Sequence, residues 1–366
     1  MSAPLSSDVR DLLALHLVPG LGPRLTTALL HRFGSAAAAL KASAEQLQEV
    51  PHIGAKIAQG LRQAMARVDV DAELALMESR NIQLLIRGRD GFPKALESIP
   101  DPPHLLYLRG VLQTADANAV AMVGSRSCTS YGRKITEQLS GDLARAGFTV
   151  ISGLARGIDG IAHRGALKAG GRTLAVLAGG LSRIYPPEHT DLAEEVVTAG
   201  ALLTEASMHM EPMAGMFPAR NRLISGLSRG VVVIEAAERS GALITASHAA
   251  DQGRPVFAVP GLMDSPSSAG VHQLLRKGAI LIRGVEDILE ELEGVRPATK
   301  PVQRQPPPIL DDIQRRIWEF LKDQPKHIDE MAQQLGLPVS QLAGALLMME
   351  MKKIARRLPG NQYERS

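Results

Sequence analysis

Between residues 105 and 293, short apolar runs alternate with segments of helical periodicity. Runs this rich in Val, Ile and Leu indicate strands buried on both faces, as in a parallel sheet covered by helices. The predicted strands are AVAMV (119–123), FTVI (148–151), TLAVL (173–177), ALLT (201–204), GVVVIE (230–235), PVFAV (255–259) and AILI (279–282). Glycine-rich turns follow several of them, and such turns gather at the carboxyl edge of a doubly wound sheet, where ligands bind. The sequence therefore predicts an α/β fold with a ligand site at that edge.

Length, charge and cysteine content limit the number of domains, the kinds of partner and the cellular compartment that we expect. At about 150 residues per domain, 366 residues suggest two or three domains. The formal charge of +3 is too small for a nucleic-acid-binding surface over the whole chain, but residues 122–172 hold eight Lys and Arg against three Asp and Glu. The single cysteine, Cys128, excludes an intramolecular disulfide and fits a reducing compartment. Without a signal peptide or an apolar run of roughly 20 residues, we expect a cytoplasmic protein with no membrane partner.

Residues 1–80 have helical periodicity and contain two similar pieces, LVPGLGPRLTTALLHRFGS and EVPHIGAKIAQGLRQA. Each has a proline and a glycine-containing turn, followed by apolar residues at helical spacing. The pair resembles the helix-hairpin-helix repeats of SAM-like helical domains. In the DNA-binding form of that motif the turn amides face a phosphate; Gly20 and Gly22 retain this possibility, whereas His52 replaces the first glycine of the second copy. Contact with DNA and helix packing alone both stay open.

The end of the chain is predicted to be a separate module. Residues 294–309, with RPATKPVQRQPPP, are proline-rich and are expected to form an extended linker after an 81–293 core. In residues 310–366, three amphipathic segments precede a Pro-Gly-Asn turn between two short strands, the order of a winged helix. The third helix offers mainly Ser340, Gln341 and Gly344 to a partner. Base readout and a protein-binding or regulatory role are therefore both open.

The turns of the predicted core combine glycine with arginine. Neither GxxxxGK[ST] nor GxGxxG occurs, which disfavours a P-loop NTPase and a dinucleotide-dependent oxidoreductase. Arginine suits phosphate because its planar fork donates two hydrogen bonds and keeps its charge. Arg126 and Arg156 each follow a strand in a glycine turn, without an obvious structural partner. They are predicted to bind an anion.

Arg220 and Arg222, in FPARNRLISGLS, have two open interpretations. They face the same ligand, or one of them pairs inside the fold with Glu205 or Glu235 at a strand end. A carboxylate beside arginines is more often a structural partner than an acid or base. No Ser-His-Asp order, nucleophile elbow or Cys-His set appears either. The sequence therefore predicts a binding protein with no catalytic residue and no cofactor.

Two other polar residues have structural interpretations. Asp159 is predicted to cap the helix 160–169, since a carboxylate suits an N-cap. His163, four residues on, is placed to pair with it. No second ligand at suitable spacing supports a metal site there, so no metal is expected.

Several motifs together carry a family resemblance. They are VGSRSCTSYG, SGLARGIDGIAHRGAL, LAGGLSRIYPPEH, FPARNRLISGLSRGVVVIEA, SGALITASHAADQGRPVFAVPG and SAGVHQLLRKGA. In order and spacing they resemble the DNA-processing protein A family (DprA, also called Smf) over roughly residues 85–290. The resemblance implies an extended Rossmann-like core that binds single-stranded DNA, protects incoming strands in natural transformation and helps to load the RecA recombinase. It also implies a SAM-like domain before the core, a winged helix after it, and a homodimer formed through the core.

The resemblance extends to individual residues. The predicted DNA-binding set is Gly124, Ser125, Arg126, Gly153, Arg156, Phe217, Arg220 and Arg222. In SGLARGID, glycines 153 and 157 are interpreted as letting the backbone approach a phosphate. The loop MHMEPMAGM, before Phe217, lacks the lysine that relatives often place there.

Phe217 is predicted to stack on bases. It precedes Pro218 and is expected on a loop at the carboxyl edge of the sheet. The alternative is a core phenylalanine that pins this loop, with Met213, Met216 and Leu223 around its ring.

A different function also stays open. The predicted core resembles nucleotide-processing hydrolases such as phosphoribohydrolases, in which a strand-end glutamate assists cleavage of a glycosidic bond in nucleoside monophosphates. Those enzymes carry a PGGxGT turn, whereas PGLMDSP stands here.

Overall fold

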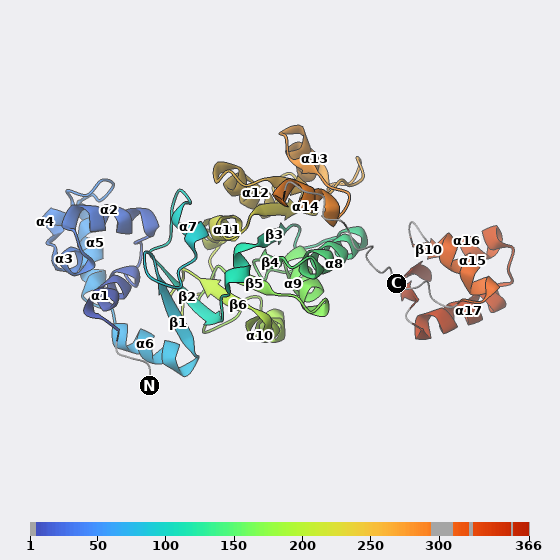
Figure 1. The fold of residues 1–366 in the computed structure, drawn as a ribbon, viewed down its shortest axis with the longest axis horizontal. Coiled ribbons are helices and arrows are strands. Elements are labelled where there is room, and N and C mark those ends of the chain that lie inside the picture. The colour runs from blue at the N-terminus through green and yellow to red at the C-terminus, as the bar shows by residue number, and fades with distance from the viewer. Residues whose placement is uncertain (1–4, 294–309, 322–324, 353, 366) are drawn as a thin grey trace. The chain divides into compact units, whose positions relative to one another are not determined.

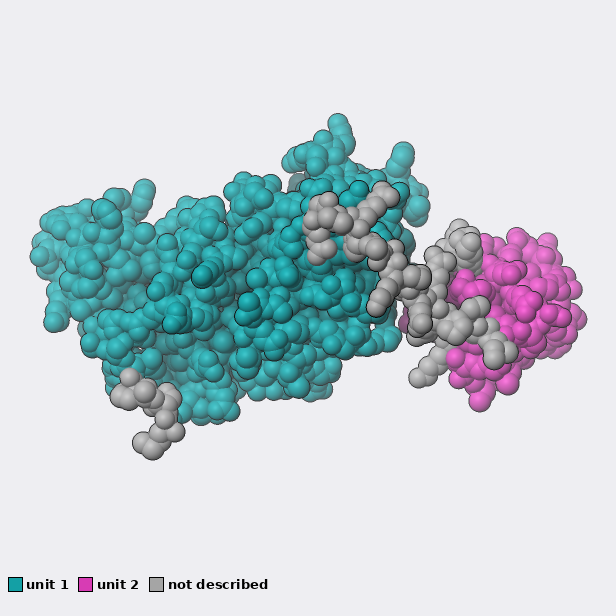
Figure 2. Space-filling model, in the orientation of Figure 1, with its two compact units in different colours: residues 1–297 teal, residues 298–366 magenta. Residues whose placement is uncertain are grey.

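The computed structural model describes residues 5–293, 310–321, 325–352 and 354–365. The chain divides into two compact units, residues 1–297 and 298–366 (Figure 1, Figure 2). The predicted linker, 294–309, lies outside the described residues. No helix within the described ranges is long and apolar enough to cross a membrane.

All seven predicted strands are present in one sheet of the first unit. They are β3 (Ala119–Val123), β4 (Thr149–Ser152), β5 (Thr173–Leu177), β6 (Ala201–Thr204), β7 (Gly230–Val233), β8 (Val256–Ala258) and β9 (Ile280–Leu281). Each pairs in parallel with its neighbours among the seven. The predicted α/β fold with a mostly parallel sheet is confirmed.

Two antiparallel strands extend this sheet beyond β6, namely β1 (Ile82–Ile86) and β2 (Leu105–Gly110). The strand order is β1-β2-β6-β5-β4-β3-β7-β8-β9. The order reverses at β3, because the chain continues to β4 on one side and later returns with β7 on the other. Ligands of doubly wound sheets bind outside the carboxyl ends at such a reversal. The topology thus positions the turns after β3 and β4 for a ligand.

Helices cover both faces of the sheet (Figure 1). One apolar cluster includes side chains of α8 (Ser130–Arg145), α9 (Ile158–Lys168) and α14 (Val285–Glu293). Another includes side chains in and around α7 (Lys94–Glu97), α11 (Met216–Gly226), α12 (Gly241–Asp251) and α13 (Ala269–Arg276). A third lies near α10 (Thr190–Ala199), which follows the 3₁₀ turn η2 (Pro187–His189); η1 (Thr114–Ala117) precedes β3. Cover on both faces explains why the strands are unbroken apolar runs.

The N-terminal segment is the predicted tandem of helix-hairpin-helix repeats, so the SAM-like domain is confirmed. Its helices are α1 (Ser7–His16), α2 (Pro23–Phe33), α3 (Ala36–Lys41), α4 (Ala44–Leu47), α5 (Ala55–Met65) and α6 (Val70–Ser79). In the first hairpin Gly20 has φ +86°, and in the second His52 takes the same left-handed conformation at φ +70°. The second turn therefore keeps a left-handed residue despite its departure from glycine.

These helices and the sheet belong to one compact unit. The hydroxyl of Tyr107 in β2 donates to Oε1 of Glu73 in α6 at 2.8 Å. The same oxygen accepts from the amide of Met208 at 2.8 Å. Because Tyr107 is fully buried, these bonds satisfy groups that would otherwise be costly to remove from water.

The second unit is a winged helix, as predicted. Its elements are α15 (Asp312–Phe320), β10 (Lys326–His327), α16 (Ile328–Leu335), α17 (Val339–Met351), β11 (Ala355–Leu358) and β12 (Gln362–Arg365). The strands form a three-stranded antiparallel sheet in the order β10-β12-β11. Besides its small polar residues, α17 exposes Leu347, Met348 and Met351. Apolar side chains do not read base edges as basic or amide groups do, but the choice between DNA and a protein partner stays open.

Candidate nucleic-acid interface

The turns after β3, β4 and β5 meet at the carboxyl edge of the sheet. They enclose a small hollow lined by Arg126, Gly153, Ala155, Arg156, Leu177, Ala178, Gly179, Gly180, Arg183, Tyr185, Pro186, Pro212 and Phe217. The hollow has a volume of about 20 Å³. One water needs about 10–15 Å³ of such space, so the hollow has room for one water and not for a nucleotide. A nucleotide therefore lies on this surface and does not enter the hollow.

Arg126 and Phe217 form the centre of the site. The guanidinium carbon of Arg126 lies 4.9 Å from the centroid of the Phe217 ring, a cation–π distance. On another side, the ring of Tyr185 meets Phe217 edge-on, with centroids 6.1 Å apart and planes at 61°. Phe217 is half-buried, so part of its ring remains open to a ligand.

The predicted loop position of Phe217 is wrong, because helix α11 begins at Met216 and places Phe217 in its first turn. Pro218 does not prevent the helix from beginning at Met216. Proline lacks an N–H, but the N–H groups of a first helical turn have no intrahelical acceptor, so no hydrogen bond is lost. Arg126 and Tyr185 contact the ring of Phe217, and Met213 is 61% exposed. These contacts favour a surface platform over a core phenylalanine, but the stacking role stays a prediction.

Arg156 has a partner that the sequence did not reveal. Its Nε donates to Oε1 of Glu188 in η2. Both side chains are about half exposed, at 51% and 50%. The hydrogen bond from Arg156 holds the pKa of Glu188 below its usual range, so the carboxylate stays ionised. An incoming phosphate would compete with Glu188 for this arginine, and exposed pairs of this kind are easily exchanged.

Arg220 lies inside the fold and not at the surface. It is only 6% exposed, and its Nη1 donates to the carbonyl oxygens of Gly153, at 2.9 Å, and Val176. Burial lowers the pKa of Arg220 to about 10, and the nearby Asp159 opposes that shift. Arg220 therefore holds the ends of β4 and β5, a role that the sequence interpretation did not include.

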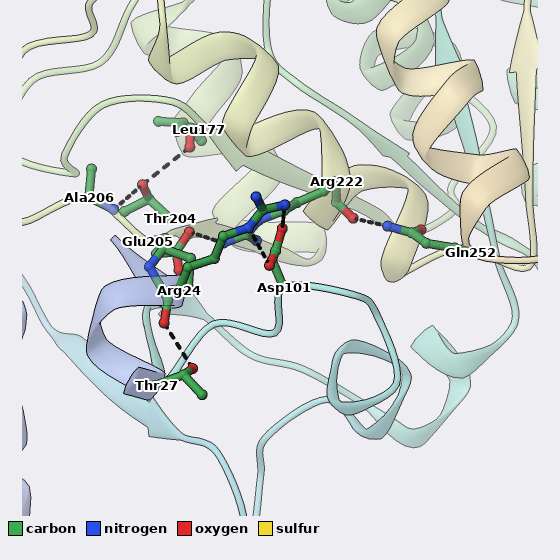
Figure 3. Close-up of polar contacts among 10 residues, drawn as sticks. Arg24, Thr27, Asp101, Leu177, Thr204, Glu205, Ala206, Arg222 and Gln252 are labelled. Atoms are coloured by element: carbon green, nitrogen blue, oxygen red, sulfur yellow. Dashed lines mark hydrogen bonds and ion pairs between the residues drawn. The ribbon is translucent and has the colours of Figure 1, made fainter. Parts of the chain in front are cut away.

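Arg222 is the arginine that pairs inside the fold. It is 7% exposed, and its Nη2 lies 2.5 Å from Oε2 of Glu205, which confirms the predicted pairing for this residue (Figure 3). Burial raises the pKa of Glu205, and Arg222 counteracts this. Glu235 instead accepts from the amide and the hydroxyl of Thr129. Neither carboxylate is thus held as an unpartnered acid or base.

The glycines of the site are required by the chain's own atoms. Gly157 has φ +70°, and a Cβ there would lie 2.2 Å from the carbonyl oxygen of Ser125. A Cβ on Gly153 would lie 2.4 Å from Nη2 of Arg220, and one on Gly124 would lie 2.6 Å from Ile158. Close packing of the turns after β3 and β4 explains these glycines without a ligand. Their predicted contact with phosphate stays a prediction.

Asp159 and His163 differ from their predicted roles. Helix α9 begins at Ile158 with Gly157 as its N-cap, so Asp159 lies within the first turn and does not cap it. Its Oδ2 accepts from the amide of Gly153 at 3.1 Å. His163 does not pair with Asp159; its Nδ1 lies 2.6 Å from the hydroxyl of Thr173. Across the described residues, no three His, Cys, Asp or Glu side chains cluster as metal ligands would.

His163 is expected to make stability depend on pH. The Thr173 hydroxyl donates to the carbonyl of Val150, so it accepts from Nδ1–H of His163, and Nε2 has no partner among the described atoms. Burial lowers the pKa of His163 from 6.5 to about 3. The unfolded chain therefore binds this proton first, and the free energy of unfolding falls as the pH drops from 6.5 toward 3, by up to about 1.4 kcal/mol per pH unit.

Urea unfolding at about pH 7 and about pH 5 measures this contribution. His163→Asn should be less stable than wild type near neutrality, because it leaves a cavity, but should lose less stability on acidification. Equal losses in the two proteins would show that His163 does not cause the dependence.

The sequence reasoning did not single out Tyr185, Arg183 and Glu188. All three follow the glycine pair after β5, in LAGGLSRIYPPEH. An arginine and an aromatic residue after a glycine turn could have indicated from the sequence that these residues belong to the site. Arg183 is 79% exposed and pairs with Glu211 at 3.1 Å.

The fold and the site define a doubly wound α/β protein with an arginine and aromatic surface at its carboxyl edge. The family model for DNA recombination-mediator protein A matches residues 83–293. Residues 301–361 match the DprA winged helix domain and residues 9–66 the SAM-like helix-hairpin-helix tandem. The chain belongs to the DNA recombination-mediator protein A family, as the resemblance predicted.

Individual relatives agree with this assignment. The chain is 38% identical to protein Smf of Escherichia coli K12 over 300 residues, covering 80% of each chain. It is 32% identical to protein Smf of a Synechocystis strain over 388 residues, covering 96% of this chain and 98% of the relative.

Two solved structures of DNA processing protein A are also similar. The Streptococcus pneumoniae protein has a TM-score of 0.68 and 33% identity, covering 79% of this chain and 99% of its own. The Helicobacter pylori protein, described for its single-stranded DNA binding mode, has a TM-score of 0.53 and 31% identity, covering 58% and 96%.

Proposed function

We propose that this protein binds single-stranded DNA on the surface formed by Arg126, Arg156, Tyr185 and Phe217. The observation that carries the proposal is the guanidinium of Arg126 lying 4.9 Å from a half-open phenylalanine ring at the sheet reversal. This places a phosphate-binding group beside a base-stacking group. The Helicobacter pylori relative, described as binding single-stranded DNA, supports the same ligand.

In this proposal the arginines bind phosphates and the phenylalanine binds bases. Arg126 and Arg156 neutralise phosphates, and the glycine-turn amides add hydrogen-bond donors. The face of Phe217 stacks on a base, which contributes about 1–3 kcal/mol per base and accepts any sequence. Duplex DNA cannot use this face, because its bases are already stacked. The proposal involves no catalytic residue and no cofactor.

The biological role proposed for the chain rests on the family resemblance. In this proposal the protein protects incoming single strands during natural transformation and passes them to the RecA recombinase. It acts in the cytoplasm as a homodimer formed through the α/β core. The buried positions of Arg220 and Arg222 suit a supporting role in this proposal, in which Arg220 ties α11 to the ends of β4 and β5 and Arg222 ties the same helix to Glu205 after β6.

Competition between single-stranded and duplex oligonucleotides tests the proposal. We expect oligo-dT to bind about 5- to 150-fold more tightly than a duplex of equal length, the equivalent of one stacked base. Equal affinities would contradict it.

A second assay tests the hydrolase alternative, in which Glu205 or Glu235 would assist glycosidic cleavage. We expect no free base from nucleoside monophosphates, because Arg222 and Thr129 already bind these carboxylates. Release of base would favour the hydrolase.

A further inference from the structure

A second hollow lies beside the Phe217 surface, between the first hairpin of the N-terminal domain and the sheet. Its volume is about 210 Å³. One wall is formed by residues 18–23, the turn that leads from α1 into α2, and another by residues 204–207, at the end of β6. Leu177 and Ala178 line both hollows, so the two adjoin. The first turn of α11 contributes Phe217 to one hollow and Met216 to the other.

Direct contacts hold the hairpin in this position. Arg24 at the start of α2 donates to both carboxylate oxygens of Asp101, at 2.8 and 2.7 Å (Figure 3). The hydroxyl of Thr27, one turn later, lies 2.9 Å from Nε2 of His104. A two-bond contact between planar groups fixes orientation as well as distance. The glycine turn of the hairpin is thereby built into the wall of the hollow.

The lining suits an uncharged planar group. It is mostly apolar, with Leu17, Val18, Leu21, Leu177, Met210, Met216 and Leu223. Burial lowers the pKa of His16 to about 4, so that ring is neutral near pH 7, and Arg222 balances the carboxylate of Glu205. Apolar walls with few polar groups are typical of small-molecule sites. At about 210 Å³, the hollow is many times larger than the roughly 10–15 Å³ of such space that one water needs.

A buried arginine also lines the hollow. Arg220 lines the hollow, is 6% exposed, and its Nε has no hydrogen-bond partner among the described atoms. At the rim, helix α2 spans 11 residues and begins at Pro23, and its N-cap Gly22 has no side chain to cap it, so the first-turn amides after Pro23 are available to a phosphate.

We propose that this hollow receives one unpaired nucleobase from the strand whose neighbouring base stacks on Phe217. The phosphate between the two nucleotides then lies toward the turn that contains Gly20 and Gly22. The first hairpin thus serves as a wall of the single-strand site. This inference rests on the proposed single-stranded DNA function.

Filling the hollow tests the inference. A Cβ on Gly22 meets nothing within 4 Å, and its φ of −88° suits any residue. We expect Gly22→Trp to weaken oligo-dT binding about five-fold or more, the equivalent of at least about 1 kcal/mol for one lost base contact. Gly54→Trp is the matched control, since Gly54 is the N-cap of α5 in the second hairpin, a Cβ there also meets nothing within 4 Å, and it does not line the hollow. Wild-type affinity in Gly22→Trp, together with weakened binding in Phe217→Leu, overturns the inference and leaves the proposed function standing. Wild-type affinity in both variants overturns the proposed function as well.

Cross-linking gives an answer that does not depend on folding of the tryptophan variant. Oligo-dT carrying one 4-thiothymidine is irradiated with the full-length wild-type chain, and the attached peptide is identified by mass spectrometry. Attachment within residues 18–23 or at Met210 supports the inference. Attachment confined to Tyr185 and Phe217 overturns it.

Discussion

Arg126→Ala is expected to weaken single-stranded DNA binding about 10- to 150-fold, the equivalent of about 1.5–3 kcal/mol for a charge-assisted hydrogen bond. No carboxylate among the described residues pairs with this guanidinium, and its ring contact is with Phe217. Its charge is therefore free for phosphate. Each phosphate contact of a single strand contributes about −0.7 to the slope of log affinity against log salt, so the slope should become shallower by about that amount. The melting temperature should change little, because an exposed cation–π contact contributes only about 0.5–1 kcal/mol.

Arg145→Ala is the matched control for this loss of charge. Arg145 ends α8, at the edge of the sheet opposite the site, and pairs on the surface with Asp142 at 2.5 Å. We expect its affinity and salt slope to remain those of wild type. Fluorescence anisotropy of labelled oligo-dT at several salt concentrations measures both quantities. An Arg126→Ala protein with the affinity and slope of the control would remove Arg126 from the interface.

Phe217→Leu is expected to weaken oligo-dT binding by about 1–3 kcal/mol without changing the salt slope. Leucine keeps much of the apolar volume but has no π-face, so it packs against the protein and cannot stack on a base. Phosphate contacts are untouched. The same change in a packing residue would lower stability and leave affinity alone, so the two roles predict opposite results.

Phe33→Leu provides the matched control. Phe33 is also half-buried with an arginine over its ring, since the guanidinium carbon of Arg32 lies 5.4 Å from its centroid. It belongs to the core of the N-terminal helices. Melting temperature and oligo-dT affinity are measured for both variants. Loss of stability with wild-type affinity in Phe217→Leu would make Phe217 a packing residue.

Much of the fold can be predicted from the sequence, because local patterns of residues determine it. Unbroken apolar runs identify the seven parallel strands, since strands covered on both faces have no polar alternation. The two antiparallel strands, β1 and β2, were not predicted. β1 is only partly buried and Gln83 interrupts its apolar residues, whereas β2 begins with the buried apolar run LLYL, a signal that the sequence did carry. Pairing with β2 at the edge of the sheet is a long-range contact.

Part of the candidate site could likewise be predicted from the sequence, and part could not. Glycine turns after successive strands indicate the carboxyl edge, and this places Arg126, Arg156 and Phe217 near one another. The sequence could not show that Glu188 pairs with Arg156, because 32 residues separate them along the chain. Nor could it show that Tyr185 meets the ring of Phe217.

The sequence by itself determined the order of the strands along the chain, the two hairpins, the winged helix and the turns in which the arginines lie. Only the tertiary structure decided which arginines face a ligand. Arg220 and Arg222 stand two residues apart on one helix, yet one binds backbone carbonyls and the other Glu205, while Arg126 stays open over Phe217. The physical reason is that an arginine's role depends on whether a buried acceptor lies within reach of its guanidinium, and those acceptors come from distant strands brought together by packing of the sheet.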